Sequence, residues 1–290
     1  YRPELMSVIV VGDIERDKAE KLIKKHFSFP GPQTPVSRPE YTVKPGNETE
    51  ICKIPDPELT YATVEISVKT ERPSRKTESD YRRMLLESLA WSMFNNRLDE
   101  IARKPEPPFI GAGGGAGQIV RTAGNVSVYA SADTDMVKEA LSALVEETER
   151  VSRFGFTDAE LDRKKADYLK SIEEYYLERE NIPSSSLASE LTDFYLKDIF
   201  MPGADAEYEL YNRLVPGISL EEINQFARNL LPAKGRTVTV IYPQKAEVPG
   251  VAELTSIAES DGYIILEPGE VVKKDSITDV YCYNSLKELF

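Results

Sequence analysis

Seven prolines crowd into residues 30–59 and divide this chain into a short N-terminal segment and a long main body. They are Pro30, Pro32, Pro35, Pro39, Pro45, Pro55 and Pro57. Proline lacks a backbone N–H and has a fixed φ, which excludes regular helix and the centre of a sheet. Structureless connections longer than about 12–15 residues are uncommon inside one compact domain. We therefore predict that residues 30–59 are a linker between two domains.

The segment before these prolines has the pattern of one strand and one helix. Residues 6–12 read MSVIVVG, an apolar run typical of a short buried strand that ends at Gly12-Asp13. The next apolar residues have the spacing of one helix face: Ala19, Leu22, Ile23 and Phe27. Such a pair is too small to form a core alone. We therefore expect residues 1–29 to be the tail of a preceding domain, and the opening Tyr1 agrees with a piece of a longer protein.

The main body, residues 60–243, combines a sheet with helices. Val64, Ile66 and Val68 alternate with polar residues, which predicts a half-buried strand. Further strands are predicted at 109–120, 124–132 and 237–241, with helices at 79–102, 137–145, 157–182, 187–196 and 219–230. Two of these helices open with capping boxes, Thr157-x-x-Glu160 and Ser219-x-x-Glu222. The order predicts an α+β fold with a mainly antiparallel sheet and helices packed on one face.

Residues 244–290 are acidic and interrupted by glycine and proline. A short helix is predicted at 251–259, and we otherwise expect a second linker.

Charge and rare residues exclude several classes of protein. The 36 Lys and Arg against 49 Asp and Glu give a net charge of −13, which disfavours nucleic acid as a partner because its recognition needs a basic surface. No apolar run approaches the roughly 20 residues of a membrane span. The chain has one histidine, His26, and two cysteines, Cys52 and Cys282, which we expect to be free thiols. A site with two histidine ligands is therefore impossible here, and we predict neither a catalytic site nor a metal site in this chain.

Two motifs have both a functional and a plain structural interpretation. The run from Gly111 to Gly117 could be a phosphate loop, but it precedes a strand instead of a helix and lacks a following Gly-Lys-Ser/Thr. We favour a strand or turn that another backbone approaches closely. Arg103 ends the helix 79–102 and either interacts with the helix dipole in solvent or pairs with a peptide carboxylate in a cleft.

The opening residues carry a resemblance to a known family. Tyr1, Pro3, Met6, Val8, Val10, Gly12 and Asp13 match a segment of the pattern Y-x-P-x-x-M-x-[LV]-x-V-x-G-D. With the helix 19–27 and the proline-rich stretch that follow, it resembles the pitrilysin/insulinase family of zinc peptidases, the inverzincins. The segment Arg97 to Arg103 resembles the family's R-L-x-x-x-[VI]-R segment. The resemblance covers about residues 1–243 and implies the metallopeptidase-like α/β sandwich.

The resemblance implies a non-catalytic second domain of one half of a bacterial zinc protease. The H-x-x-E-H motif belongs to the preceding domain, where zinc is expected, and residues 244–290 resemble the linker toward the next half. This domain is then expected to form chamber wall and peptide-binding surface, to contact the parent's other domains and a peptide substrate, and to lie in the periplasm or cell envelope. Arg103 stands at a substrate-binding arginine position, while Phe109 or Ile110 replaces the partner tyrosine.

Two other functions stay open on the sequence. The parent could be a non-proteolytic structural or processing-partner subunit of the same family, or the domain could be a free-standing peptide-binding module. An H-x-x-E-H motif upstream of Tyr1 would distinguish the first reading from these. Peptide specificity and oligomeric state are not encoded in any motif found here.

Overall fold

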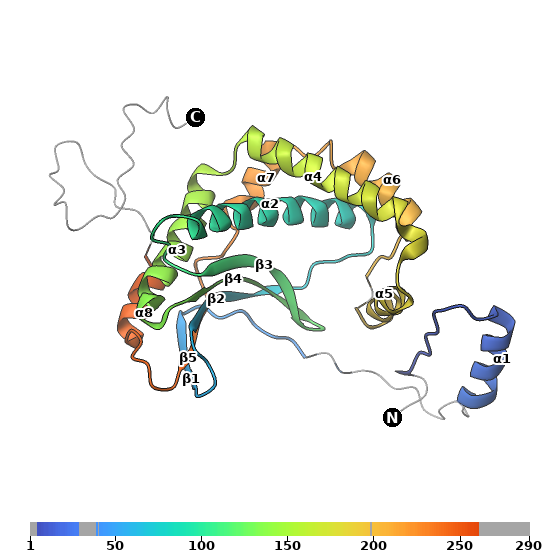
Figure 1. Cartoon of the computed structure of the whole chain (residues 1–290), viewed down its shortest axis with the longest axis horizontal. Coiled ribbons are helices and arrows are strands. Elements are labelled where there is room, and N and C mark those ends of the chain that lie inside the picture. Colours follow the sequence, from blue (N-terminus) through green and yellow to red (C-terminus); the bar gives the residue numbers. More distant parts are fainter. Residues whose placement is uncertain (1–4, 29–38, 40, 198, 261–290) are drawn as a thin grey trace.

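The computed structural model describes residues 5–28, 39, 41–197 and 199–260. A five-stranded sheet forms its base, with strand order β1-β5-β2-β4-β3 (Figure 1). The strands are β1 (Glu50–Asp56), β2 (Ala62–Glu71), β3 (Gly111–Val120), β4 (Ala123–Ala132) and β5 (Arg236–Pro243). Only β1 and β5 pair in parallel, and the other pairs are antiparallel. The prediction of an α+β fold with a mainly antiparallel sheet is confirmed.

Helices cover one face of this sheet, as Figure 1 shows for α2, α4 and α7 above the strands. The helices are α1 (Arg16–Phe27), α2 (Glu78–Ala102), α3 (Val137–Phe154), α4 (Asp158–Leu177), α5 (Ser184–Lys197), α6 (Ala204–Leu214), α7 (Leu220–Ala227) and α8 (Val251–Ala258). Within the described ranges, no helix combines the length and the apolar character that crossing a bilayer requires.

The hydrophobic core lies between the sheet and the helices α2 and α3. Alternate residues of the strands point into it, among them Ile66 and Val128, which are fully buried. Phe94 of α2 and Leu141 of α3 meet them from above, also fully buried. The alternation that predicted β2 therefore arises because one face of the sheet packs on the core.

The helices begin where their capping residues predict. Thr157 Oγ1 accepts a hydrogen bond from the Glu160 N–H, and the Glu160 carboxylate accepts one from the Thr157 N–H. The second predicted capping box, Ser219 with Glu222, forms in the same way. A third box, Thr77 with Asp80, opens α2 and was not foreseen because aspartate replaces the usual glutamate.

The strand predicted at residues 6–12 is wrong. This segment is irregular, and its apolar side chains are exposed, with Met6 at 50% and Val10 at 49%. A strand needs a neighbouring strand for its backbone groups, and the described part of the chain offers this segment none. The helix predicted next does form, as α1, yet none of its residues is buried.

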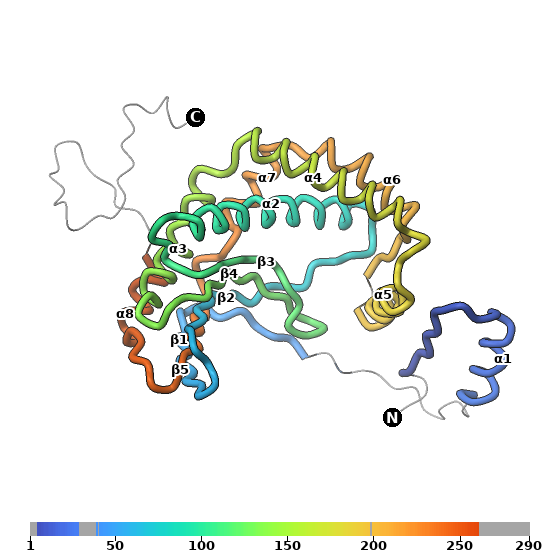
Figure 2. Tube along the Cα trace, in the orientation of Figure 1, coloured from blue at the N-terminus to red at the C-terminus, as the bar shows by residue number. Residues whose placement is uncertain are grey.

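The expected linker 30–59 contains a strand that the prolines had appeared to disfavour. β1 occupies the last part of this range and pairs in parallel with β5, so that segments from nearly opposite ends of the chain lie side by side (Figure 2). Pro55 is tolerated because β1 is the edge strand, where a missing N–H costs no ladder bond. Residues 50–56 are therefore part of the folded unit.

The expected linker 244–290 likewise contributes to the core. Leu254 and Ala258 of α8 are fully buried, and α8 packs against α3 and the β1–β5 edge. Residues beyond 260, including Cys282, lie outside the described residues. Helix α6 was not predicted, because Leu210 and Leu214 are the only buried residues in its eleven.

Candidate functional site

The face of the sheet opposite the core is built from small and polar side chains. The strand register aligns one residue of each strand in a row across it, in the order Cys52, Thr239, Glu65, Tyr129 and Gly113. The thiol of Cys52 is free and exposed. The helices that cover the other face leave this one open in Figure 1.

Tyr129 has the largest side chain in this row, and the position of its ring requires a glycine beside it. Its ring lies across Gly113 of β3, where an added Cβ would be 2.9 Å from the Tyr129 Oη. The side chain of Tyr129 is 48% exposed. An amphipathic phenol held flat on a strand offers both an apolar surface and a hydrogen-bonding group to a ligand.

β3 is the free edge of the sheet, and α2 protects its first half. Asn95 of α2 donates from Nδ2 to the Gly114 carbonyl (3.1 Å) and accepts from the Gly114 N–H at Oδ1 (2.7 Å). These two backbone groups therefore point away from β4, and the amide side chain satisfies them as a neighbouring strand would. This arrangement blocks pairing at Gly114 with another chain.

The second half of β3 has no such protection. Residues 116–120 are all exposed, including Ile119 at 51% and Val120 at 43%. Strand residues two apart direct their backbone groups to the same side, so the N–H of Ala116 points outward as that of Gly114 does. Residues 116–120 thus form an open strand edge that can pair with an extended peptide.

A half-buried ion-pair network anchors the far end of α2. Arg97 Nε lies 2.7 Å from Glu160 Oε1, and its terminal nitrogen donates to the Gly155 carbonyl at 2.9 Å. A second carboxylate, that of Glu147, is 3.5 Å away and only 3% exposed. The guanidinium also stacks over the Phe156 ring at 4.8 Å.

The charges in this network shift one another's pKa. Burial pulls the pKa of Arg97 down, but the bonds to Glu160 and Glu147 outweigh burial and raise it. Burial would raise the pKa of Glu160, yet Arg97 and the capping bonds from Thr157 hold it below its ordinary value. Burial keeps the pKa of Glu147 above its ordinary value despite Arg150 and Arg97. Arg97 therefore stays charged and ties α2 to α3 and α4.

The two residues predicted to bind substrate lie in different environments. Arg103 is the C-cap of α2; its backbone N–H bonds to the Glu100 carbonyl at 3.3 Å, and its side chain is exposed. Among the described residues the Arg103 side chain has no hydrogen-bond or ion-pair partner. Phe109 is 2% exposed and packs in the core. The structure thus presents Arg103 to solvent and buries Phe109 in the core.

The described residues do not fit a zinc site. No three His, Cys, Asp or Glu side chains within the described ranges are grouped as metal ligands. The chain's one histidine, His26, lies on exposed α1, and Cys52 lies on the open face of β1. Nitrogen and sulfur ligands of this kind must converge to hold zinc, so no step of metal chemistry is assigned to this chain.

The fold and this chemistry are those of a non-catalytic domain of a zinc peptidase family. Residues 1–168 match the peptidase M16 inactive domain, and the chain belongs to that family. The resemblance to the pitrilysin/insulinase peptidases is thereby confirmed.

Curated relatives are zinc proteases by description. The chain is 29% identical over 247 residues to a zinc protease PQQL-like protein of Arabidopsis thaliana, which covers 83% of this chain and 22% of that protein. It is 24% identical over 265 residues to a probable zinc protease PqqL of Haemophilus influenzae, covering 88% and 28%. The chain therefore spans about a quarter of the length of these relatives.

Solved structures share the fold at low sequence identity. The first half of the periplasmic protease PqqL from Escherichia coli superposes with a TM-score of 0.78 at 18% identity, over 88% of this chain and 56% of that one. An insulinase family protease from Yersinia pestis gives a TM-score of 0.75 at 13% identity, over 87% and 54%. The prediction of a metallopeptidase-like sandwich is confirmed.

Proposed function

We propose that this domain forms part of the substrate-chamber wall of a zinc metalloendopeptidase and offers a peptide-binding surface there. The observation that carries the proposal is the open edge at residues 116–120, beside a sheet face that no described helix covers. Membership of an inactive peptidase domain family supports a role in binding instead of chemistry.

The open edge suits an extended polypeptide because pairing with a strand uses backbone groups that every peptide has. Main-chain hydrogen bonds then supply affinity without selecting a sequence, while side chains alternate above and below the sheet. The exposed ring of Tyr129 adds a place for an apolar side chain. A peptidase that accepts many unfolded substrates requires this kind of recognition.

The charge of the domain favours one class of peptide. The net charge of −13 on the whole chain produces a negative potential that attracts basic peptides and raises their rate of association. Arg103 would be a local exception on this surface. We propose that its exposed guanidinium binds a carboxylate or carbonyl of the peptide, and that Phe109 keeps the turn beneath it in place.

Zinc and the catalytic groups are proposed to reside in a preceding domain of the parent. The apolar residues exposed on the described part of segment 1–29, such as Met6, Val10 and Phe27 at 49–50%, support its packing on that domain. Residues 60–243, extended by β1 and α8, form the inactive domain, and a link to the next half would follow it. The parent's other domains are then the partners of this one.

A location in the periplasm or cell envelope is proposed for the parent. The description of Escherichia coli PqqL as a periplasmic protease supports it.

Replacing Ala116 by proline is expected to weaken the binding of an extended peptide at least about fivefold, since one outward N–H would be lost, worth about 1 kcal/mol. The sheet should be preserved because that N–H faces away from β4. Fluorescence anisotropy with a labelled, unstructured ten-residue peptide measures the change. Ala116→Ser keeps the N–H and serves as the control, with unchanged affinity. Equal binding by the proline and serine variants would contradict pairing at this edge.

A further inference from the structure

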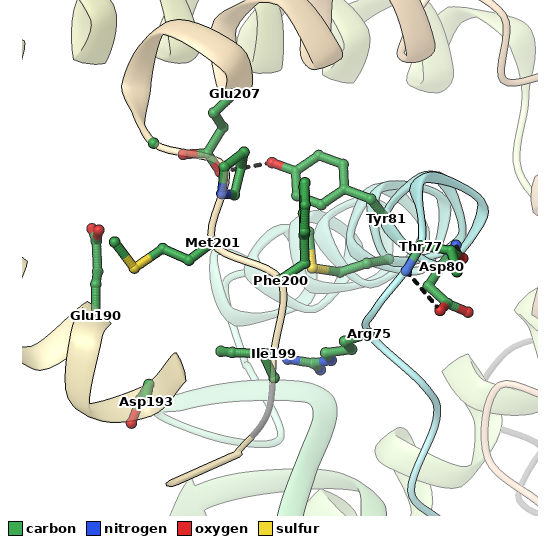
Figure 3. A pocket seen from close by; sticks show the side chains of 13 residues that line it. Arg75, Thr77, Asp80, Tyr81, Glu190, Asp193, Ile199, Phe200, Met201 and Glu207 are labelled. Carbon is green, nitrogen blue, oxygen red and sulfur yellow. Dashed lines mark hydrogen bonds between the residues drawn. The ribbon is translucent and has the colours of Figure 1, made fainter. Parts of the chain in front are cut away.

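A cavity of about 230 Å³ lies at the start of α2, and none of residues 116–120 lines it. It is enclosed by the first turns of α2, by α5 and by residues 199–203 (Figure 3). Apolar and aromatic side chains form its walls, namely Tyr81, Met84, Phe200 and Met201. Two carboxylates, Glu190 of α5 and Glu207 of α6, border it near Met201 in Figure 3.

The aromatic walls are held at fixed angles. Tyr81 meets Phe200 edge to face, with ring centroids 6.1 Å apart and 77° between the planes. Tyr81 also packs edge to face on Tyr211 at 6.3 Å. The Tyr81 hydroxyl donates to Glu207 Oε1 at 2.6 Å, which fixes that carboxylate beside the rings. The site is therefore organised before any ligand arrives.

Neither Glu190 nor Glu207 has a cationic partner among the described residues. The other carboxylates of the lining are occupied, since Asp193 pairs with Lys197 at 2.7 Å and Asp80 caps α2. Arg75 is the one cation of the lining, and it lies beside Ile199 in Figure 3, whereas Glu190 lies nearer to Met201. Burial raises the pKa of Glu87, and the charges of Arg83 and Arg75 only partly oppose that rise.

Both carboxylates, which lack a cationic partner among the described residues, affect the pKa of one tyrosine. Burial raises the pKa of Tyr175, and the negative charges of Glu190 and Glu207 raise it further. The cavity consequently combines aromatic ring faces with negative charge that no residue of the described chain neutralises.

We propose that this cavity binds the cationic side chain of an arginine or lysine from a polypeptide. Aromatic rings attract a cation through their quadrupole, and carboxylates form charge-assisted hydrogen bonds with guanidinium or ammonium groups. A metal ion fits less well, because the described residues include no group of three metal-binding side chains.

The volume of the cavity suits a single amino-acid side chain better than a drug-sized molecule. Pockets for drug-sized molecules measure about 300–1,000 Å³, and this one falls below that range. The inference deepens the proposed function, since it adds a preference for basic residues to a peptide-binding domain. The cavity and the open edge are nevertheless separate sites, and their tests can fail independently.

The test compares two small probes that differ in charge alone. N-acetyl-arginine N-methylamide is titrated into the 290-residue chain at low salt and followed by NMR, in parallel with the citrulline analogue, a neutral isostere of arginine. We expect the arginine probe to bind at least about tenfold more tightly, a difference of about 1.4 kcal/mol. Raising the salt concentration should weaken the binding of the arginine probe, because the attraction is electrostatic.

Substitutions locate the binding. Glu190→Gln and Glu207→Gln are each expected to weaken the arginine probe about tenfold, while Glu209→Gln, an exposed carboxylate on α6, should leave affinity within about twofold. Equal binding of the two probes, no binding of arginine, or unchanged affinity in both cavity variants would overturn the proposal. The probe is too short to add a strand, so Ala116→Pro should not affect it, which separates this outcome from failure of the proposed function.

Discussion

Replacing Arg97 by alanine is expected to lower the free energy of unfolding by about 3 kcal/mol, among the largest effects of any single charge in this domain. The guanidinium is 18% exposed and holds Glu160 at 2.7 Å. Its removal leaves Glu147, which is 3% exposed, with Arg150 as its nearest cation. It also frees the Gly155 carbonyl and uncovers the Phe156 ring.

Urea denaturation followed by circular dichroism measures this change. Arg213→Ala is the matched control, because Arg213 pairs with Glu78 at side-chain exposures of 58% and 53%. Such exposed pairs contribute roughly 0–1 kcal/mol, so the control should change stability by less than about 0.5 kcal/mol. A similar loss in both variants would show that the network does not anchor α2.

The Arg97 effect should shrink in acid. The folded-state pKa of Glu160 lies below its ordinary value of 4.5. A depressed carboxyl pKa contributes stability above the unfolded value, and that stability is lost as pH falls through the folded value. The native chain therefore loses more stability in acid than the alanine variant, and the difference between the two should shrink as the pH falls below 4.5 and through the folded-state pKa of Glu160.

Local patterns predicted most of the elements of this fold. The alternation of Val64, Ile66 and Val68 predicted β2, because each of these side chains packs on the core. The capping boxes at Thr157 and Ser219 fixed two helix starts to the residue. These signals depend on residues a few positions apart, which a sequence displays directly.

Features that depend on distant segments escaped prediction. β1 exists because β5, nearly two hundred residues later, pairs with it, as Glu50 with Thr237. The segment 6–12 has a strand-like composition but no such partner within the described residues. Composition indicates that a strand is possible, whereas pairing decides whether it forms.

The candidate sites show the same limit. Arg97 and Arg103 both lie in the segment that resembles the family, and the resemblance implied a substrate-binding role for Arg103 alone. The partners that make Arg97 structural, Glu147 and Glu160, come 50 and 63 residues later. The cavity at Tyr81 likewise draws Glu190 and Glu207 from over a hundred residues away. For the Arg97 network, the only sequence signal was that Glu160 stands in a predicted capping box.

The glycine run from Gly111 to Gly117 was predicted to be a strand or turn that another backbone approaches closely. The structure shows at which of these glycines a Cβ would clash with a neighbour. At Gly114 an added Cβ would lie 2.8 Å from the Trp91 ring and 2.9 Å from Val128 Cγ1, with the Ser127 carbonyl oxygen at 3.1 Å. At Gly115, one residue further, an added Cβ meets nothing within 4 Å. The two glycines share a strand and a composition but differ in their surroundings.

Gly114→Ala is therefore expected to destabilise the domain by roughly 2–4 kcal/mol, through overpacking against α2 and strain in the Asn95 bonds. The neighbouring contacts cannot all yield, because Trp91 is itself packed edge to face on fully buried Phe94 at 5.7 Å. Gly115→Ala should change stability by less than about 0.5 kcal/mol, since alanine adds no clash and restricts the unfolded chain. Thermal and urea unfolding of the two variants measure the difference. Equal stabilities of the two variants would contradict the close approach of Trp91 and Val128 to β3 at Gly114.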